Sequence, residues 1–201
     1  AALRADGTAW VWGGYGDQLV PLQAAGIAQV TALAGGHVPV ALRCDGTVWR
    51  LAFASAATKI DALSNIVGIA AGTAHWLALG SDGSLLAWGD DYYGQLGSGV
   101  RAYRTQPARV IGLTGVTAIA AGDGHSLALD AAGELRAWGT SRLGQLGTGG
   151  LSSGPGLRGF STPQAVVGSL TPSAVSASRE TSFALEPDGD FWAWGYTSLG
   201  I

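Results

Sequence analysis

The chain has 201 residues, of which 47% are hydrophobic and 12% are charged, a composition that fits a folded protein and excludes a disordered one. Its formal net charge of −3 provides no basic footprint for nucleic acid. The single cysteine, Cys44, excludes an internal disulfide framework. No apolar run approaches the roughly 18 residues that a membrane-spanning helix needs, so we expect no membrane span.

One short element returns along the whole chain. It is an Ala-Leu pair followed, four residues after the leucine, by a glycine that suits a tight turn. These turn glycines are Gly7, Gly46, Gly83, Gly133 and Gly189. A Trp-Gly pair follows in four of the five copies, at Trp12, Trp88, Trp138 and Trp194, whereas Arg50 and Leu51 stand there in the second copy. Recurrence of this kind predicts a repeat architecture.

The two longest copies, residues 72–97 and 122–147, align without any insertion. Each contains two short apolar runs around a turn, such as residues 127–129 and 135–138, and this pattern predicts a β-hairpin. Two further runs lie upstream, at residues 116–122 and 108–111, so we expect four short strands in each unit and no helix. Because such a unit cannot bury both faces alone, it must stack on its neighbours, as in a propeller or a solenoid.

The phrase Ala-Ala-Gly-x-x-His-Ser-Leu-Ala-Leu, followed by Trp-Gly-x-x-x-x-Gly-Gln-Leu-Gly, resembles the regulator-of-chromosome-condensation repeat. Residues 120–147 match it nearly throughout, residues 70–97 almost as well, and the other copies in part. The resemblance implies an all-β fold, a β-propeller of four-stranded blades that is commonly a ring of seven. This chain would then hold about four blades and a partial terminal one, with the rest supplied by missing sequence or by another chain.

We expect one domain over residues 1–201, divided into repeat units at roughly 1–36, 37–73, 74–123, 124–178 and a partial unit at 179–201. The short first two units resemble the compact repeats of secreted bacterial propellers that inhibit β-lactamases. Ten of the eleven basic residues are arginine, which is typical of GC-rich coding. We therefore expect a bacterial protein that is extracellular or on the cell surface, with a cytoplasmic location as the alternative.

His75 and His125 occupy the histidine position of the repeat, whereas Val38 and Thr181 replace it elsewhere. Since repeat symmetry places the two histidines in separate, equivalent pockets, we expect each to make a structural hydrogen bond from strand to loop rather than to bind a metal or act in catalysis. The aspartates that precede the turn glycines are interpreted as turn residues. The sequence shows no catalytic constellation, so we expect no enzyme activity, no cofactor and no metal site.

The segments that follow each Trp-Gly pair, here called links, vary while the repeats stay constant. The third link includes residues 98–107, and the fourth, at residues 148–163, is the longest and rich in glycine and serine. Variable loops on a constant scaffold are typical places for recognition, and Tyr and Arg are frequent interface anchors. The alternative, that these are ordinary solvated loop residues, stays open. The candidates for partner binding are Tyr92, Tyr93, Arg101, Tyr103, Arg104, Arg142, Arg158 and Phe160.

The leading hypothesis is a non-catalytic scaffold that binds a protein partner through loops on one face of the propeller. One alternative is a structural or display module of a large bacterial surface or filament protein. Another is nucleotide exchange on a small GTPase, as in the eukaryotic founder of the family. The sequence leaves open the identity of the partner, the full number of blades, and whether the fourth link is ordered.

Overall fold

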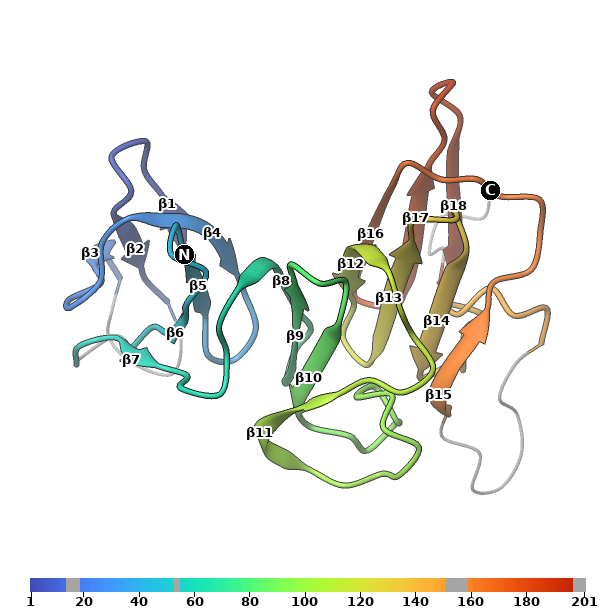
Figure 1. The fold of residues 1–201 in the computed structure, drawn as a ribbon, viewed down its shortest axis with the longest axis horizontal. Coiled ribbons are helices and arrows are strands. Elements are labelled where there is room, and N and C mark those ends of the chain that lie inside the picture. The colour runs from blue at the N-terminus through green and yellow to red at the C-terminus, as the bar shows by residue number, and fades with distance from the viewer. Residues whose placement is uncertain (14–18, 53–54, 151–158, 197–201) are drawn as a thin grey trace.

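The computed structural model describes residues 1–13, 19–52, 55–150 and 159–196, and within them the chain forms five antiparallel sheets in sequence order (Figure 1). The first three sheets are β1 (Ala2–Leu3), β2 (Ala9–Val11) and β3 (Leu22–Gln23); β4 (Val30–Ala34), β5 (Val40–Arg43), β6 (Val48–Arg50) and β7 (Thr58–Lys59); and β8 (Ile66–Ala71), β9 (His75–Gly80), β10 (Leu85–Gly89) and β11 (Arg104–Arg109). The last two are β12 (Val116–Ala121), β13 (His125–Asp130), β14 (Leu135–Gly139) and β15 (Phe160–Ala165); and β16 (Ala174–Ser178), β17 (Thr181–Leu185) and β18 (Phe191–Gly195).

Every sheet is a meander in which each strand pairs with its neighbours in sequence. The strands β4, β8, β12 and β16 contact one another from sheet to sheet, so they form the inner edge of the stack. Alanine and glycine in these strands allow that close approach. At the other edge, β11 and β15 each contain a proline, Pro107 and Pro163, which is tolerated there because an edge strand has N–H groups with no ladder partner to lose. The predicted all-β fold with four-stranded units is confirmed.

The four predicted runs of a unit do not all belong to one sheet. The run at residues 108–111 was expected to join the runs that follow it, but β11 pairs instead with β10 of the preceding sheet. The sheets therefore have the period of the sequence repeats but different boundaries. One sequence repeat therefore contributes strands to two neighbouring sheets.

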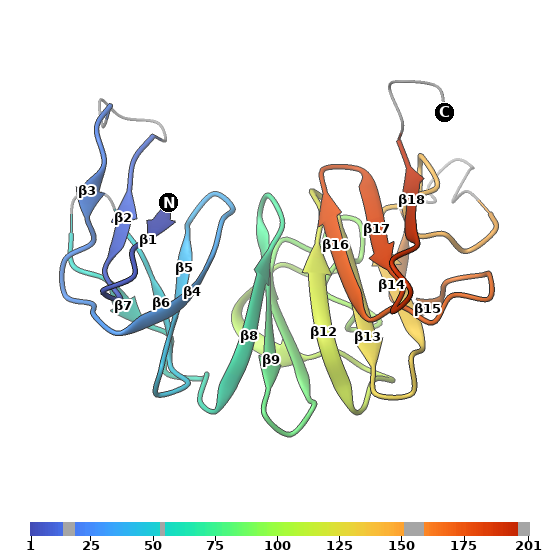
Figure 2. The same cartoon turned by 90° about the horizontal axis from the view of Figure 1, so that it is seen from above.

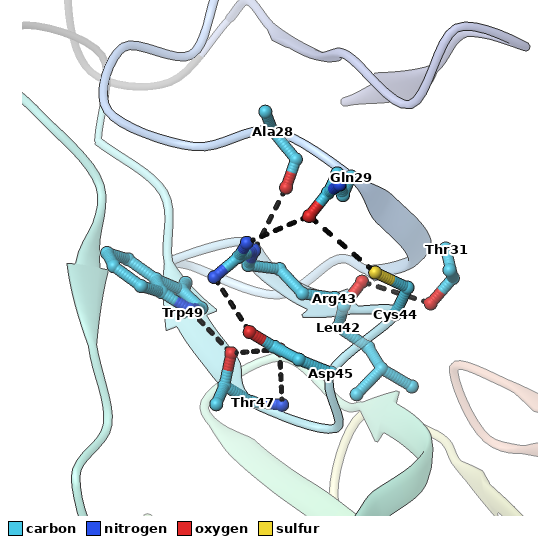
Figure 3. A network of polar contacts seen from close by, with 9 residues as sticks. All are labelled: Ala28, Gln29, Thr31, Leu42, Arg43, Cys44, Asp45, Thr47 and Trp49. Carbon is cyan, nitrogen blue, oxygen red and sulfur yellow. Dashed lines mark hydrogen bonds and ion pairs between the residues drawn. The ribbon is translucent and has the colours of Figure 1, made fainter.

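The aspartates before the turn glycines act as predicted. The Asp45 carboxylate accepts hydrogen bonds from the backbone N–H and the hydroxyl of Thr47, at 3.1 and 2.6 Å (Figure 3). Thr47 Oγ1 in turn accepts from the indole of Trp49, at 2.9 Å. The Thr47 hydroxyl, followed by the Thr47 N–H, lowers the pKa of Asp45. Equivalent bonds are made by Asp6, Asp82 and Asp188.

The core lies between sheets. Leu77, Leu85 and Ala87 on one face of the third sheet pack with Ala128 and Trp138 of the fourth sheet. Similar clusters lie between the other sheets, so every internal sheet is covered on both faces. The prediction that a unit must stack on its neighbours is confirmed.

Figure 2 shows the five sheets side by side, with the first and last at opposite ends of the row. Both end faces expose apolar side chains. Trp12 on the first sheet is 41% exposed, whereas its repeat equivalent Trp138 is fully buried. On the last sheet Phe191 is 65% exposed, and it stacks on Phe183 with ring centroids 5.6 Å apart. The end sheets thus carry the same apolar faces as the internal ones.

The turn between the first and second strands of a sheet is here called its inner turn. The inner turns bring the backbones of neighbouring sheets into contact. A Cβ on Gly72 would lie 2.2 Å from the carbonyl oxygen of Gly122, and a Cβ on Gly122 would lie 2.5 Å from that of Arg179. A Cβ on Gly35, in the corresponding turn of the second sheet, would meet nothing within 4 Å. A Cβ would also lie 2.3 Å from Cε1 of His75 at Gly72 and 2.2 Å from Cε1 of His125 at Gly122. Both the neighbouring sheet and the histidine of the same sheet therefore require glycine at these two positions.

We expect Gly72→Ala to lower the free energy of unfolding by about 1–3 kcal/mol, because the added methyl group clashes with the Gly122 carbonyl of the next sheet and with the His75 ring of its own sheet. The matched control, Gly35→Ala, has open space and is expected to be neutral or to raise stability by up to about 1 kcal/mol. Urea denaturation followed by tryptophan fluorescence measures both. Equal stabilities for the two variants would contradict the proposed packing constraint.

Candidate protein-interaction surface

Two buried histidines tether neighbouring sheets. Nε2 of His75, on β9, lies 3.0 Å from Oγ of Ser126, on β13 of the next sheet. Ser126 Oγ donates its proton to the backbone carbonyl of Gln95, at 2.9 Å. Since the serine proton is used on that carbonyl, the His75 Nε2 carries the hydrogen and donates to Ser126. His75 and Ser126 are fully buried.

The same arrangement recurs one sheet later. His125 Nε2 lies 2.9 Å from Ser182 Oγ, which donates to the Gln145 carbonyl at 2.7 Å. The indoles of Trp138 and Trp194 donate to the carbonyls of Gln95 and Gln145, at 2.8 and 3.0 Å. The expectation that these histidines are structural and equivalent is supported, but the predicted partner was wrong. Each bonds to a strand of the next sheet rather than to a loop, because the repeat places a serine directly opposite it.

Burial controls the charge state of both histidines. It lowers the pKa of His75 to about 3, with a smaller contribution from His125, and lowers that of His125 to about 4 against a small opposing effect of Asp123. The Nδ1 atoms of both rings are buried with no hydrogen-bond partner in the described part of the chain. A proton on Nδ1 would add an unpaired buried donor, so both rings are neutral at physiological pH.

The junction between the second and third sheets uses different residues. Trp76 stands where the later sheets have serine, and Val38 stands where they have histidine. The Trp76 indole donates directly to the Val38 carbonyl, at 3.0 Å, and stacks on Trp88 with centroids 6.1 Å apart. A single bulky donor thus replaces the histidine–serine pair.

The third link is taken from here on as the whole segment between β10 and β11, residues 90–103. It is held by buried polar side chains. Gln95 Oε1 accepts from the Tyr93 N–H at 2.9 Å, and its Nε2 donates to Asp90 at 2.8 Å. The Asp91 carboxylate accepts from the N–H groups of Leu96 and Ala102, at 2.9 and 3.2 Å. Burial raises the pKa of Asp91, and these two N–H groups counteract it. The third link is therefore anchored at both ends.

The fourth link is likewise taken as the whole segment between β14 and β15, residues 140–159, and its described residues 140–150 begin in the same way. Gln145 Oε1 accepts from the Leu143 N–H at 2.9 Å. Thr140 and Ser141 replace the two aspartates, and the Gln145 Nε2 is buried with no partner in the part of the chain that the structure describes. The carboxylate bonds that fix the third link therefore have no counterpart at these two positions of the fourth link.

The two links meet through aromatic and guanidinium groups. Tyr92 and Tyr93 pack edge to face, with centroids 4.9 Å apart and an interplanar angle of 90°. The Arg142 guanidinium lies over the Tyr93 ring at 5.6 Å, a cation–π contact, and Arg101 donates to the carbonyl of Gly159. Tyr92 is 49% exposed. These residues, Tyr92, Tyr93, Arg101 and Arg142, form what we call the link cluster.

The remaining candidates lie around the link cluster or away from it. Tyr103 is strongly exposed at the end of the third link. Arg104 begins β11, where its Nε is buried and has no hydrogen-bond partner in the described residues. Phe160 begins β15 and is half-buried against the core between the fourth and fifth sheets, so it contributes packing. Arg158 lies outside the described residues.

Sequence reasoning overlooked a second polar surface. The inner turns of four sheets line a cavity of about 410 Å³, where Thr73 Oγ1 donates to the Asp123 carboxylate at 2.9 Å. His37 and Arg179 occupy the corresponding places in the second and fifth sheets. The signal was present, because this turn position changes from copy to copy as the links do.

Family models match the central part of the chain. The regulator of chromosome condensation (RCC1) repeat matches residues 82–129 in one form, and residues 66–95 and 116–145 in another. These residues lie in the third and fourth sheets, where the histidine tethers occur. No curated protein sequence matches the chain.

Solved structures share the fold. Yeast RCC1 (Prp20), solved with Kap60 bound, is 22% identical over 96% of this chain, with a TM-score of 0.80. Prp20p from Saccharomyces cerevisiae, described with its binding to Gsp1p and histones, is 23% identical over 96%, with a TM-score of 0.81. Human WBSCR16 is 23% identical over 88%, with a TM-score of 0.71. The chain spans about half of each, 53%, 55% and 52%. The sheets are blades of a β-propeller, and their fold is similar to that of these RCC1 structures.

We expect stability to fall as the pH is lowered from 7 to 5. The folded-state pKa values of His75 and His125 lie below the ordinary 6.5, so the unfolded chain takes up protons that the folded chain does not. Each histidine then costs about 2 kcal/mol of stability at pH 5. Urea denaturation at both pH values should show a smaller difference in stability for His75→Gln/His125→Gln than for the parent chain. An unaltered pH dependence in the double variant would exclude this origin.

We expect Ser126→Ala to lower the free energy of unfolding by about 1–3 kcal/mol, because the His75 N–H is left buried without an acceptor. The control Ser64→Ala, at an exposed position, should stay within about 0.5 kcal/mol of the parent. Chemical denaturation at neutral pH compares them. If Ser126→Ala costs no more than the control, the tether does not stabilise the contact between the sheets.

Proposed function

We propose that this chain is a non-catalytic protein-interaction scaffold that binds a protein partner through the link cluster. The observation that carries the proposal is the joining of two variable links from neighbouring blades by the contact of Arg142 with Tyr93. A surface assembled from two repeats has a shape that neither repeat specifies alone. Such a surface is suited to recognising one partner.

The third link supports this proposal by its preorganisation. Asp91 and Gln95 are buried and bind backbone N–H groups within the link. A loop that is already held in one shape loses less conformational entropy when a partner binds. Tyr92 is thus presented on a supported backbone.

The chemistry of the cluster fits a protein surface. Tyr and Arg are enriched among the residues that contribute most to protein–protein affinity. Tyr92 offers an edge-packed ring and a hydroxyl, and Arg142 offers a planar guanidinium already aligned with an aromatic ring. We infer that the partner presents an acidic or polar rim around an apolar contact for Tyr92.

The non-catalytic part of the proposal is supported by the role of the histidines. His75 and His125 are fully buried, are neutral, and hydrogen-bond to serines whose protons are donated to backbone carbonyls. This geometry is opposite to that of a nucleophilic serine, which must donate its proton to the histidine. The two Ser–His pairs therefore serve as tethers.

Nucleotide exchange on a small GTPase is a second candidate, and one observation favours it. The fold resembles that of Prp20p, a structure described together with its binding to Gsp1p. Below 25% identity this similarity concerns the fold, so exchange needs its own assay. Faster release of labelled nucleotide from Gsp1p in the presence of this chain would replace the scaffold proposal with exchange.

We expect a photo-crosslinking amino acid at Tyr92 or at Tyr103 to capture the same partner from an extract of the source organism. A third variant carries the probe at Val67, which is 59% exposed on β8, and should not capture that partner. Arg142→Ala should reduce capture at Tyr92 because it removes the group that positions Tyr93. Mass spectrometry identifies the captured protein.

Two results would contradict the proposal. One is equal capture by the probe at Val67, which would indicate nonspecific contact. The other is capture at Tyr92 that is unaffected by Arg142→Ala and Arg101→Ala, which would show that the cluster does not form the binding surface. The thermal unfolding of each variant is measured alongside to confirm that it is folded.

A further inference from the structure

A cavity of about 310 Å³ lies between the fourth and fifth sheets, beside the turn that joins β13 to β14. Its lining comes from this turn and from the segment that leads into the fifth sheet, and it includes Gly133, Glu134, Leu135, Val166 and Leu170. The register of β13 and β14 places this turn at the opposite end of the two strands from the fourth link. The cavity is therefore separate from the link cluster.

The three earlier junctions between sheets show what fills this place. In each, the carbonyl of the turn glycine accepts a hydrogen bond from the N–H of the residue that begins the first strand of the next sheet. The pairs are Gly7 with Val30, Gly46 with Ile66 and Gly83 with Val116, at 3.0, 3.0 and 3.1 Å. Three residues before each donor stands a buried apolar side chain, in the order Ile27, Leu63 and Leu113. The next sheet thus closes each turn with one N–H and one apolar side chain.

The segment that enters the fifth sheet aligns residue by residue with the one that enters the fourth. Ala118 of β12 and Ala174 of β16 pair with equivalent leucines of the strand that follows. The hydroxyl just before each alanine donates to the carbonyl of that leucine, at 3.2 and 3.1 Å. This register gives two pairs of counterparts, Pro172 with Val116 and Ser169 with Leu113.

The fourth junction lacks both groups that close the earlier turns. Because Pro172 has no N–H, the Gly133 carbonyl accepts no hydrogen bond within the described residues. Ser169 has no apolar side chain to bury, and it is exposed. A Cβ on Gly83 would lie 2.9 Å from Gly115 of the next sheet, whereas a Cβ on Gly133 would meet nothing within 4 Å. The cavity is thus the place of one N–H and one apolar side chain that this chain does not supply.

We propose that the cavity binds a segment of a partner polypeptide that supplies these two groups. The segment inserts one side chain of the size of leucine or isoleucine against Leu135, Val166 and Leu170. It also donates one backbone N–H to the Gly133 carbonyl, which is the bond that Pro172 cannot make. The occupant is inferred from the three earlier junctions, where the same chemical pair fills the same place.

The charges and the size of the cavity favour a neutral occupant of this kind. Glu134 and Arg136, the charged side chains of the lining, pair with each other at 2.6 Å, so the pair offers no net charge to an ionic ligand. The volume lies at the lower end of the roughly 300–1,000 Å³ that is typical of ligand pockets. Such a volume suits one apolar side chain together with its backbone.

The probe is the segment that fills the equivalent place one junction earlier. It is the peptide acetyl-Leu-Thr-Gly-Val-Thr-amide, which has the sequence of residues 113–117. The peptide is titrated into isotopically labelled protein, and binding is followed by the NMR chemical shifts of the protein. We expect saturable shifts of the Gly133 amide and of the methyl groups of Leu135 and Val166. Absence of saturable shifts at these residues overturns the proposal.

Two matched peptides separate the two contacts. With N-methyl valine in place of valine, the peptide should bind about tenfold more weakly, because it cannot donate to the Gly133 carbonyl. With serine in place of leucine, it should bind at least about tenfold more weakly, because the burial of the apolar side chain is lost. Equal binding of the N-methyl peptide would show that the cavity takes any apolar group, and equal binding of the serine peptide would show that no side chain is inserted. Either result overturns the proposal.

Variants of the protein locate the peptide. Ser169→Leu/Pro172→Val restores the two missing groups within the chain, so it should close the cavity and abolish binding of the peptide. The matched control Ser169→Asn keeps a polar side chain there and should bind as the parent does. Thermal unfolding of each variant confirms that it is folded, and Ser169→Leu alone, which keeps Pro172, replaces the double variant if that one does not fold. Undiminished binding to the variant that carries leucine at this position overturns the proposal.

Discussion

The hydrogen-bonded tether between sheets is the interaction on which the rest of the structure depends. Each sheet is apolar on both faces and has to be covered on both, so the stack is the folding unit rather than the single blade. A histidine from one sheet, a serine and a tryptophan from the next, and the carbonyl of the intervening link meet in one buried group. Because all its polar atoms but one histidine nitrogen are paired, the group also sets the orientation of one sheet on the next.

Gln95 joins the stacked sheets to the candidate binding surface. The backbone carbonyl of Gln95 receives the serine and tryptophan protons, while its side chain binds Tyr93 and Asp90 within the third link. The position of the link cluster is therefore set by the packing of the two blades. In the fourth link the corresponding Gln145 keeps its carbonyl bonds, and Thr140 stands where the third link has the aspartate that Gln95 contacts.

Much of the candidate surface was accessible from the sequence. Variation in the links indicated Tyr92, Tyr93, Arg101 and Arg142, which the structure brings together from two blades. The sequence did not separate them from Phe160, which packs against the core instead. From the sequence, a residue that is exposed for binding and a residue that packs against the core look alike in a variable loop. Side-chain direction at the start of β15 depends on its pairing with β14, and pairing is a contact between segments distant in sequence.

The amino-acid sequence by itself determined the all-β repeat fold, the hairpin turns and the structural role of the histidines. These follow from local periodicity, from glycine at the turns, and from the recurrence of the same residue types at the same spacing. Only the tertiary structure decided the boundaries of the sheets and the serine partner of each histidine. Each of these depends on which strand lies beside which, and the repeat pattern is unchanged when a strand is assigned to the preceding blade instead of the following one. Packing between sheets resolves that choice, because a single arrangement buries the apolar faces and pairs the buried polar groups together.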